Sequence, residues 1–335
     1  MKRDSYWDSL KFILIFLVVL GHCIGSYRPC GGINLAIYNF IFIFHMPLFI
    51  FVSGMFSQIN DQEKYKLGIL RILETYLVFQ LIRSVTAMLI SGNVTFMSIA
   101  SDIVTPRYTL WYLMSLIFWR LMVYFTPKKF LQDNPTSIIL ACFLISLLGG
   151  FIPVGNPFSL QRTMTFLPFF FMGYYAKNIE IKKYIAKVPP LLAIGVLLSA
   201  FLIIFFLFNR DLNIILLGNK AYWDHAELTP QTLFIARIAF LISAIIMGTL
   251  VMRLVMLKPS FPEWGEKTLF IYIYHSFLTQ AFRFVFNHGY LPQQEWVCIV
   301  ISVIIMAVLL LLSKIRFFNI LMNPVSYIIG KNGTK

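Results

Sequence analysis

The sequence predicts an all-α protein, a polytopic membrane helical bundle of about ten transmembrane helices with both termini cytoplasmic. Of its 335 residues, 59% are hydrophobic and only 13% are charged, whereas a soluble domain carries about 25% charged residues. Apolar runs long enough to cross a hydrocarbon core of about 30 Å recur along the whole chain. We therefore interpret residues 1–335 as a single integral-membrane domain.

Ten apolar spans emerge when the chain is read in windows of about twenty residues. The fifth and sixth are the weakest, because glycines and prolines interrupt them between residues 149 and 157. The first is predicted to be an uncleaved helix rather than a signal peptide, since Asp4 and Asp8 lie in its head region and no small-residue cleavage pattern follows. The predicted centres are Val18, Ile43, Val78, Leu116, Leu144, Phe169, Leu198, Ile242, Phe277 and Leu309.

The basic residues predict the orientation. The chain has 28 Lys and Arg against 14 Asp and Glu. With a cytoplasmic N-terminus, the inner loops hold eighteen of these cations and the outer loops five, as the positive-inside rule requires. The positive charge is therefore explained by short membrane loops, which indicates membrane lipids as partners and excludes nucleic acid.

The four cysteines, Cys23, Cys30, Cys142 and Cys298, are scattered and show no CxxC spacing. They predict neither a metal site nor a disulfide framework. A pair between Cys23 and Cys30 across the mouth of the first helix is the alternative.

The first span carries an unusual pair of residues, Lys11 and His22. An ionisable side chain inside a bilayer is costly, and chains that keep one usually use it. Eleven steps along a helix separate the two by about 16 Å and return them to nearly the same face. Lys11 is expected at the cytoplasmic lip and His22 near the midplane. The alternative is a membrane anchor and a hydrogen-bonded packing residue.

Two further histidines lie in apolar spans. His45 stands beside Pro47 in the second span, at a depth expected to match that of His22. His275 lies in the ninth span, where Tyr272, Tyr274 and Ser276 offer ordinary hydrogen-bond partners.

Other polar and aromatic positions have both structural and functional interpretations. Trp111 and Tyr112 fit an interfacial aromatic belt. Arg162 is predicted outside, against the charge rule, which favours a functional role. Arg120 could form a structural pair with Glu74. Ser53, Gly54 and Gly173 are typical of close helix packing.

These residues fit two kinds of chemistry. A histidine can deprotonate a hydroxyl for acyl transfer from an anionic thioester donor held by cationic side chains. It can also relay protons in an exporter or flippase of a glycan or small acid. The residue pattern alone does not separate the two.

Several sequence blocks, taken together and in order, carry a family resemblance. They resemble the integral-membrane acyltransferase family three, which modifies bacterial surface glycans, and within it the fucose 4-O-acetylase-like branch. The blocks are Tyr6-Trp7-Asp8 through Leu20-Gly21-His22, Phe44-His45-Met46-Pro47 through Ser53-Gly54, Leu110-Trp111-Tyr112-Leu113 with Trp119-Arg120, Arg162 with Phe166 through Tyr174, and Ile271 through His275.

The resemblance implies a membrane O-acyltransferase of the bacterial inner membrane. It would move an acyl group, acetyl first and succinyl or another short group as the alternative, from acyl-CoA to a sugar hydroxyl of a surface polysaccharide or its lipid-linked precursor. No cofactor is expected to be bound permanently. In the family a basic residue accompanies the essential histidine of the first helix, and those positions here are Lys11 and His22. Many members have arginine at the first position, and lysine binds phosphate as a point charge instead.

The implied mechanism assigns each residue a role. His22 is expected to act as the general base, with covalent acyl relay as the alternative, and His45 to orient it or to polarise the thioester carbonyl. Lys11 and Arg120 would hold the phosphates of acyl-CoA. The acceptor glycan would contact Trp111, Tyr112, Arg162 and His275. Many relatives carry a fused extracytoplasmic esterase-like domain. We expect no such domain here, so the helical bundle alone would bind the acceptor.

Overall fold

A computed structural model describes residues 4–26, 32–91, 103–155, 157–207, 212–224, 228–292 and 294–332. All regular structure in these ranges is helical, as the sequence predicts. The elements are α1 (Ser5–Ser26), α2 (Gly32–Met55), α3 (Gln62–Ser91), η1 (Tyr108–Leu110), α5 (Trp111–Phe125), α6 (Lys128–Asp133), α7 (Pro135–Leu148), η2 (Gly149–Phe151), η3 (Pro157–Ser159), α8 (Leu160–Ala176), α9 (Ile181–Ala186), α10 (Pro190–Leu207), α11 (Asn213–Leu216), α12 (Pro230–Leu257), η4 (Pro262–Lys267), α13 (Thr268–Asn287), α14 (Trp296–Leu312), α15 (Arg316–Met322) and α16 (Pro324–Asn332).

Each of the ten predicted centres lies inside a helix, but the structure supports fewer membrane spans by length and composition. Within the described ranges six helices qualify: α1, α2, α3, η1 with α5, α10 and α12. A seventh results if α14 and α15, which are bent by 91°, count as one span. The helices that fall short are α7, which is short, and α8 and α13, which carry buried polar side chains. Helices surrounded by protein need not be as apolar as helices that face lipid.

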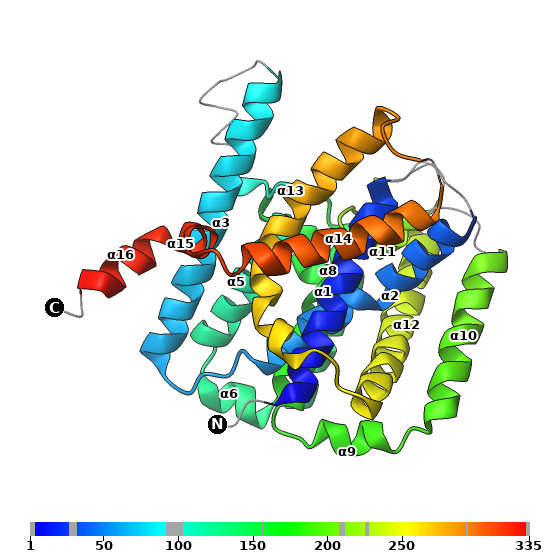
Figure 1. Cartoon of the computed structure of the whole chain (residues 1–335). Coiled ribbons are helices and arrows are strands. Elements are labelled where there is room, and N and C mark those ends of the chain that lie inside the picture. The colour runs from blue at the N-terminus through cyan, green and yellow to red at the C-terminus, as the bar shows by residue number, and fades with distance from the viewer. Residues whose placement is uncertain are drawn as a thin grey trace.

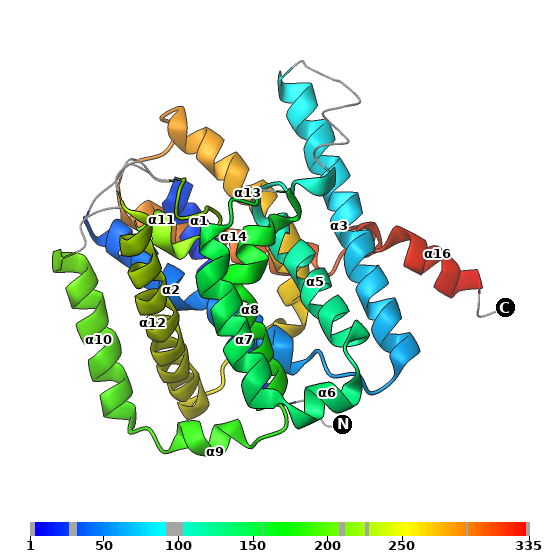
Figure 2. The same cartoon turned by 180° about the vertical axis from the view of Figure 1, so that it is seen from behind.

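The centre of the bundle is the crossing of α2 and α8 (Figure 2). A Cβ atom added to Gly54 would lie 2.0 Å from the Phe170 carbonyl oxygen, and one added to Gly173 would lie 1.9 Å from that of Phe51. The two backbones can approach this closely only because both positions are glycine. The prediction that these glycines are close-packing positions is confirmed.

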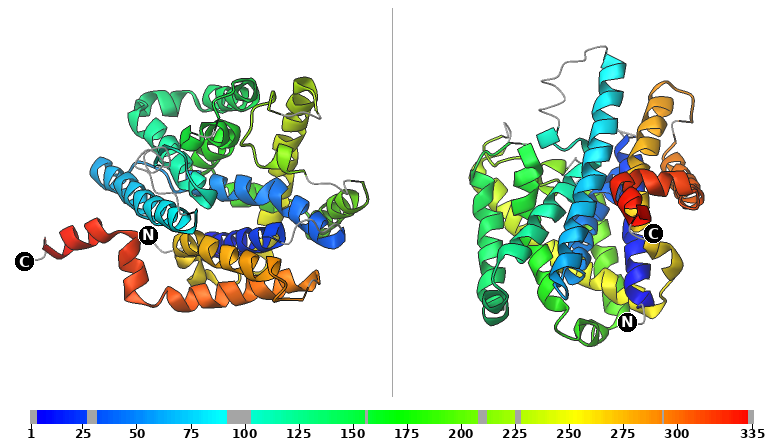
Figure 3. Two further views of the ribbon diagram at one scale, coloured as in Figure 1. Left: turned by 90° about the horizontal axis from the view of Figure 1, so that it is seen from above. Right: turned by 90° about the vertical axis from the view of Figure 1, so that its left-hand side faces the viewer.

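α1 forms the second part of the core and packs against α2, η4, α13 and α14 (Figures 1 and 3). The N-terminus, α6 and α9 gather at one end of the bundle, called the N-terminal end below. α1 runs from that end toward the opposite end. Residues early in α1 therefore lie nearer the N-terminal end of the bundle, and residues late in α1 lie nearer the opposite end.

Polar side chains connect the helices inside this core. Trp119 Nε1 donates to the Thr163 carbonyl at 3.1 Å, and Ser146 Oγ donates to the Thr165 carbonyl at 2.7 Å. Such bonds satisfy polar groups that have no water available. In contrast, α10 exposes large apolar side chains along most of its length, as a lipid-facing helix does.

The cysteines are reduced where they are described. Cys23, Cys142 and Cys298 are buried and form no disulfide among the described residues, whereas Cys30 lies outside those residues. Among those residues no group of three or more His, Cys, Asp or Glu side chains could hold a metal ion.

Candidate active site

His22 lies four residues before the end of α1 at Ser26. It therefore lies near the end of this helix that is opposite the N-terminal end. Its ring packs between two others, with centroid distances of 5.2 Å to His275 and 5.3 Å to Tyr108. These contacts place the histidine among residues of α13 and η1, far from α1 in the sequence.

His22 lines a cavity of about 520 Å³, called the His22 cavity below. His45 from α2, Trp111 from α5 and Arg162 from α8 line the same cavity. The structure thus brings four of the sequence-predicted site residues together.

The wall of this cavity contains two residues with left-handed backbone conformation. Tyr108 has φ 55° and Ser159 has φ 53°, and both line the His22 cavity. For residues other than glycine this conformation costs about 1 kcal/mol or more, and it is concentrated at functional sites. Tyr108 in this conformation lies with its ring against that of His22.

Backbone carbonyls fix the tautomers of the two neighbouring histidines. His45 Nδ1 lies 2.8 Å from the Ile41 carbonyl oxygen, and His275 Nδ1 lies 2.7 Å from that of Tyr272. Because a carbonyl oxygen only accepts hydrogen bonds, each Nδ1 carries the proton and donates it. In the neutral form of each ring, Nε2 is then left as an acceptor. His275 Nε2 is buried and has no partner within the described residues.

Two arginines lie at or near the His22 cavity, and neither pairs with a carboxylate among the described residues. Arg162 Nε donates to the Leu217 carbonyl at 3.2 Å, and its guanidinium lies 4.9 Å from the centre of the Trp111 ring. Arg83 from α3 is only 6% exposed, donates to Ser276 Oγ and lies 5.4 Å from the Tyr108 ring centre. Both interact electrostatically with His22.

Arg83 was not among the predicted site residues. The signal was present, because Arg83 is an arginine in an apolar span with no acidic residue within one helical turn. Such a residue marks a functional site by default in a membrane helix.

A second cavity, of about 460 Å³, contains the predicted donor-binding residues and is called the Lys11 cavity below. Lys11 and Arg120 both line it. Lys11 Nζ pairs with the buried Asp8 carboxylate at 2.7 Å and lies 5.3 Å from the centre of the exposed Phe56 ring. Because Lys11 lies near the start of α1, this cavity is closer to the N-terminal end than the His22 cavity.

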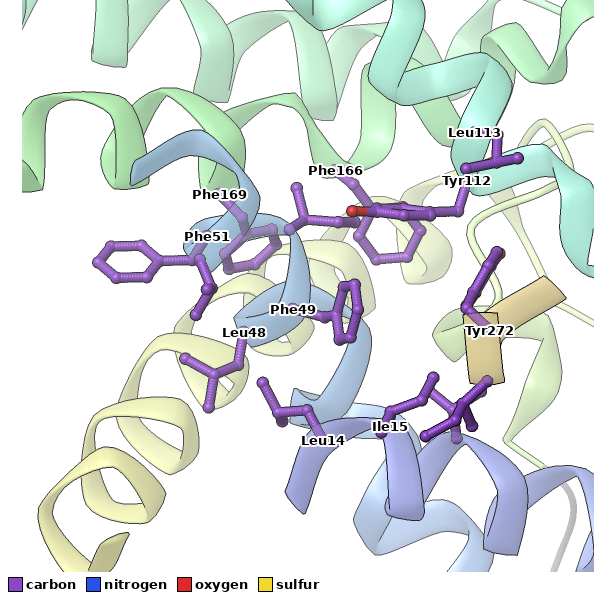
Figure 4. Close-up of a cluster of buried hydrophobic side chains, with 14 of the residues drawn as sticks. Leu14, Ile15, Leu48, Phe49, Phe51, Tyr112, Leu113, Phe166, Phe169 and Tyr272 are labelled. Carbon is purple, nitrogen blue, oxygen red and sulfur yellow. The ribbon is translucent and has the colours of Figure 1, made fainter. Parts of the chain in front are cut away.

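Tyr272 lines both cavities. Its ring centre lies 5.1 Å from that of Tyr112 and 6.4 Å from that of Phe49 (Figure 4). Tyr272 Oη donates to the Thr109 carbonyl, and Tyr112 Oη lies 2.6 Å from Ser53 Oγ. We call Phe49, Tyr112 and Tyr272 the aromatic partition, because they lie where the two cavities meet.

Three predicted residues have positions that the sequence did not indicate. Trp111 lines the His22 cavity but Tyr112 lines the Lys11 cavity, because successive helical residues point about 100° apart. His275 contacts the His22 ring but does not itself line the His22 cavity.

The alternative pairing of Arg120 with Glu74 is not found. Glu74 instead accepts hydrogen bonds from the backbone of Val325 and Ser326 at the start of α16. The Arg120 guanidinium lies 4.6 Å from the centre of the Tyr65 ring. Arg120 is therefore available to a ligand in the Lys11 cavity.

A larger cavity, of about 770 Å³, lies elsewhere among the described residues, beside Gln58, Tyr124 and Tyr174. It is lined by no histidine. The smaller His22 cavity, in contrast, combines two imidazoles, left-handed backbone and arginines that have no carboxylate partner among the described residues.

Comparison with known proteins identifies the family to which the chain belongs. The acyltransferase domain of the acyltransferase 3 family matches residues 4–313. No curated protein and no solved structure matches the chain. The chain belongs to the acyltransferase 3 family of membrane acyltransferases. It is an acyltransferase, and it acts on an acyl donor and an acceptor.

Proposed function

We propose that the protein transfers an acyl group, with acetyl as the expected one, from acyl-CoA to a sugar hydroxyl of a bacterial surface polysaccharide or its lipid-linked precursor. It would do so in the inner membrane with both termini in the cytoplasm, as a relative of the fucose 4-O-acetylase-like branch. The observation that carries the proposal is the pair of cavities that share Tyr272, one nearer the N-terminal end and lined by Lys11 and Arg120 together with Glu266, the other lined by His22.

The donor would enter the Lys11 cavity from the cytoplasm. Lys11 and Arg120 supply positive charge for the phosphates of CoA. The pantetheine arm, which is narrow and extended, would pass the aromatic partition and carry the thioester toward His22. The helical distance from Lys11 to His22 is about 16 Å, so charge recognition and chemistry take place at different depths.

The acceptor hydroxyl would bind in the His22 cavity. The neutral His22 imidazole takes the hydroxyl proton while the oxygen attacks the thioester carbonyl carbon. The tetrahedral intermediate then collapses to the ester, and the CoA thiolate leaves and takes up the proton from imidazolium His22. Atoms and charges balance without a cofactor.

His45 and His275 would orient the base. With Nδ1 donating to a backbone carbonyl, the neutral ring of each offers only an acceptor at Nε2. An acceptor cannot polarise a thioester carbonyl, but one of the two rings can receive the single N–H of neutral His22. This favours an orienting role for His45 over the polarising one.

Membership in an acyltransferase family favours group transfer over an exporter or flippase. The experiment uses protein in lipid nanodiscs, labelled acetyl-CoA and extracted surface glycan, and follows label on glycan together with CoA release. We expect transfer by the wild type and its loss in His22→Ala. His288→Ala is the matched control, because His288 is an exposed histidine at the end of α13. Equal transfer by His22→Ala and the wild type would remove His22 from the mechanism, and glycan flux without ester formation would point to transport.

A further inference from the structure

The residues that line the His22 cavity carry charge of one sign only. Arg162 and Arg283 are among them, and none of the lining residues in the described part of the chain is Asp or Glu. Arg162 comes from α8, and Arg283 is an exposed residue of α13. The cavity is therefore positive from its interior to its mouth.

A third arginine, Arg83, adds positive charge beside the cavity without lining it. Arg83 lies 5.4 Å from the ring centre of Tyr108, which itself lines the cavity. It is 6% exposed, and its Nε is buried without a hydrogen-bond partner. The ring of Phe277, 4.2 Å away, and the hydroxyl of Ser276 provide its other contacts.

Four of the described carboxylates are bound to other groups. Asp8 pairs with Lys11, Asp4 with Lys182, and Asp61 with Lys64. Glu74 binds the start of α16. Within the described residues, neither Arg83 nor Arg162 has a carboxylate within ion-pair distance. A charge removed from water without a partner is strongly unfavourable, so the fold retains the buried Arg83 against a large cost.

The geometry of Arg162 suits an incoming anion. Its Nε is used by the Leu217 carbonyl, and its guanidinium plane lies over the Trp111 ring. These two contacts fix the group while its terminal nitrogens remain as donors. A guanidinium held in this way can bind a carboxylate or phosphate through two parallel hydrogen bonds, which a lysine cannot do.

We propose that the His22 cavity binds an anionic group, a carboxylate or a phosphate, held by Arg162 and attracted by Arg283 and Arg83. This inference rests on the proposed function and adds to it the charge of a reactant. The anion has two possible carriers. One is the acceptor, as a uronic acid or a phosphate-bearing glycan, and the other is the acyl group, as the free carboxylate of a dicarboxylic acyl thioester.

Binding and kinetics test the proposal together. Protein in nanodiscs is heated at constant ionic strength with methyl glucuronide, methyl glucoside or inorganic phosphate, and the shift in the unfolding temperature is measured. Initial rates of transfer are then compared for acetyl-CoA and succinyl-CoA with methyl glucoside and methyl glucuronide as acceptors. We expect an anionic probe to stabilise the wild type and one anionic reactant to be preferred over its neutral counterpart about tenfold or more, since 1.4 kcal/mol corresponds to tenfold.

The two carriers are separated by which reactant shows the preference. If the acceptor brings the anion, acetyl transfer favours the glucuronide. If the acyl group brings it, succinyl-CoA is favoured with the neutral glucoside. In both cases Arg162→Gln should remove the preference and Arg162→Lys should keep part of it.

The matched control is Arg237→Gln. Arg237 is also a buried arginine, 3% exposed and bonded to Thr165, but it is not among the residues that line the His22 cavity. We expect it to retain the preference. If Arg162→Gln does not fold, Arg283→Gln at the exposed mouth should still weaken the preference.

The failures of the two proposals differ. Absence of any anion-dependent stabilisation, with equal rates for charged and neutral reactants, would overturn the anion site while leaving acyl transfer intact. An Arg162→Gln variant slowed equally for all reactants would also overturn it, because the arginine would then act on the transition state alone. Anion stabilisation without transfer from any donor would instead contradict the proposed function.

Discussion

The imidazole rings of His22 and His275 lie 5.2 Å apart although α1 and α13 are far apart in the chain. His275 is fully buried, and its Nδ1 is committed to backbone carbonyls of its own helix. Its remaining nitrogen, Nε2, has no partner among the described residues. Burying an acceptor in this way is unfavourable unless another group uses it. The arrangement is consistent with a second histidine that positions the first.

His275→Gln should therefore lower the turnover number about 10- to 100-fold with little change in the KM for acyl-CoA, whereas His22→Ala should lower it by the larger factor, about 10²–10⁴, that general-base catalysis contributes. Initial rates at varied donor concentration separate these effects. His288→Gln, at an exposed position of the same helix, serves as the control. A His275→Gln variant that folds and retains full turnover would exclude the positioning role.

Lys11 should act on the phosphate-bearing part of the donor. Its replacement removes the ion pair with the buried Asp8 carboxylate, and breaking such a pair would cost up to about 3 kcal/mol of stability. The informative variant is therefore Asp8→Asn with Lys11→Ala, compared with Asp8→Asn alone. The double variant should raise the KM for acetyl-CoA about tenfold but leave that for S-acetylpantetheine, which lacks the nucleotide phosphates, unchanged.

Equal effects on the two donors would show that Lys11 does not recognise the phosphates. Lys11→Arg should retain donor binding, because arginine also binds phosphate and can pair with Asp8.

The aromatic partition should keep water and the thioester apart until an acceptor is bound. Tyr272→Ala would remove the ring that both cavities share and open a path between them. We expect hydrolysis of acyl-CoA without acceptor to rise several-fold while transfer to glycan falls, because exclusion of water prevents this side reaction. Tyr272→Phe, which removes only the hydroxyl bonded to the Thr109 carbonyl, should keep hydrolysis low. If the alanine variant hydrolyses no more acyl-CoA than the wild type, the partition is not a water barrier.

Much of the fold could be predicted from the sequence because hydropathy reports it directly. All ten predicted centres lie in helices, and the structure brings His22, His45, Trp111 and Arg162 to the lining of one cavity. The number of membrane spans was harder to predict from the sequence. α8 and α13 carry polar side chains such as Gln161 and Thr279 that pack against protein, so their hydropathy does not report their position in the bundle.

Contacts between distant helices could not be predicted in the same way. The approach of His275 to His22, and the position of Arg83 behind Tyr108, depend on which faces of α1, α3 and α13 meet. Periodicity gives the apolar face of each helix but not its partner. The same holds for residues that are adjacent in the sequence. Tyr112 lines a different cavity from its neighbour Trp111, and the sequence did not predict this difference.

The glycine pair at the crossing of α2 and α8 should govern stability. Gly54→Ala would place a methyl group 2.0 Å from the Phe170 carbonyl oxygen, and Gly173→Ala would place one 1.9 Å from that of Phe51. Neither backbone can move without separating the two helices, so each variant should unfold at a much lower temperature than the wild type or fail to accumulate.

Gly195→Ala in α10 is the matched control, because nothing lies within 4 Å of the position that its Cβ would occupy. Alanine has a better helix propensity than glycine by about 1 kcal/mol, so this control should be as stable as the wild type or slightly more. Thermal unfolding in detergent, followed by size-exclusion chromatography, measures all three. If Gly54→Ala and Gly195→Ala unfold at the same temperature, the close approach of α2 and α8 is not what holds the bundle together.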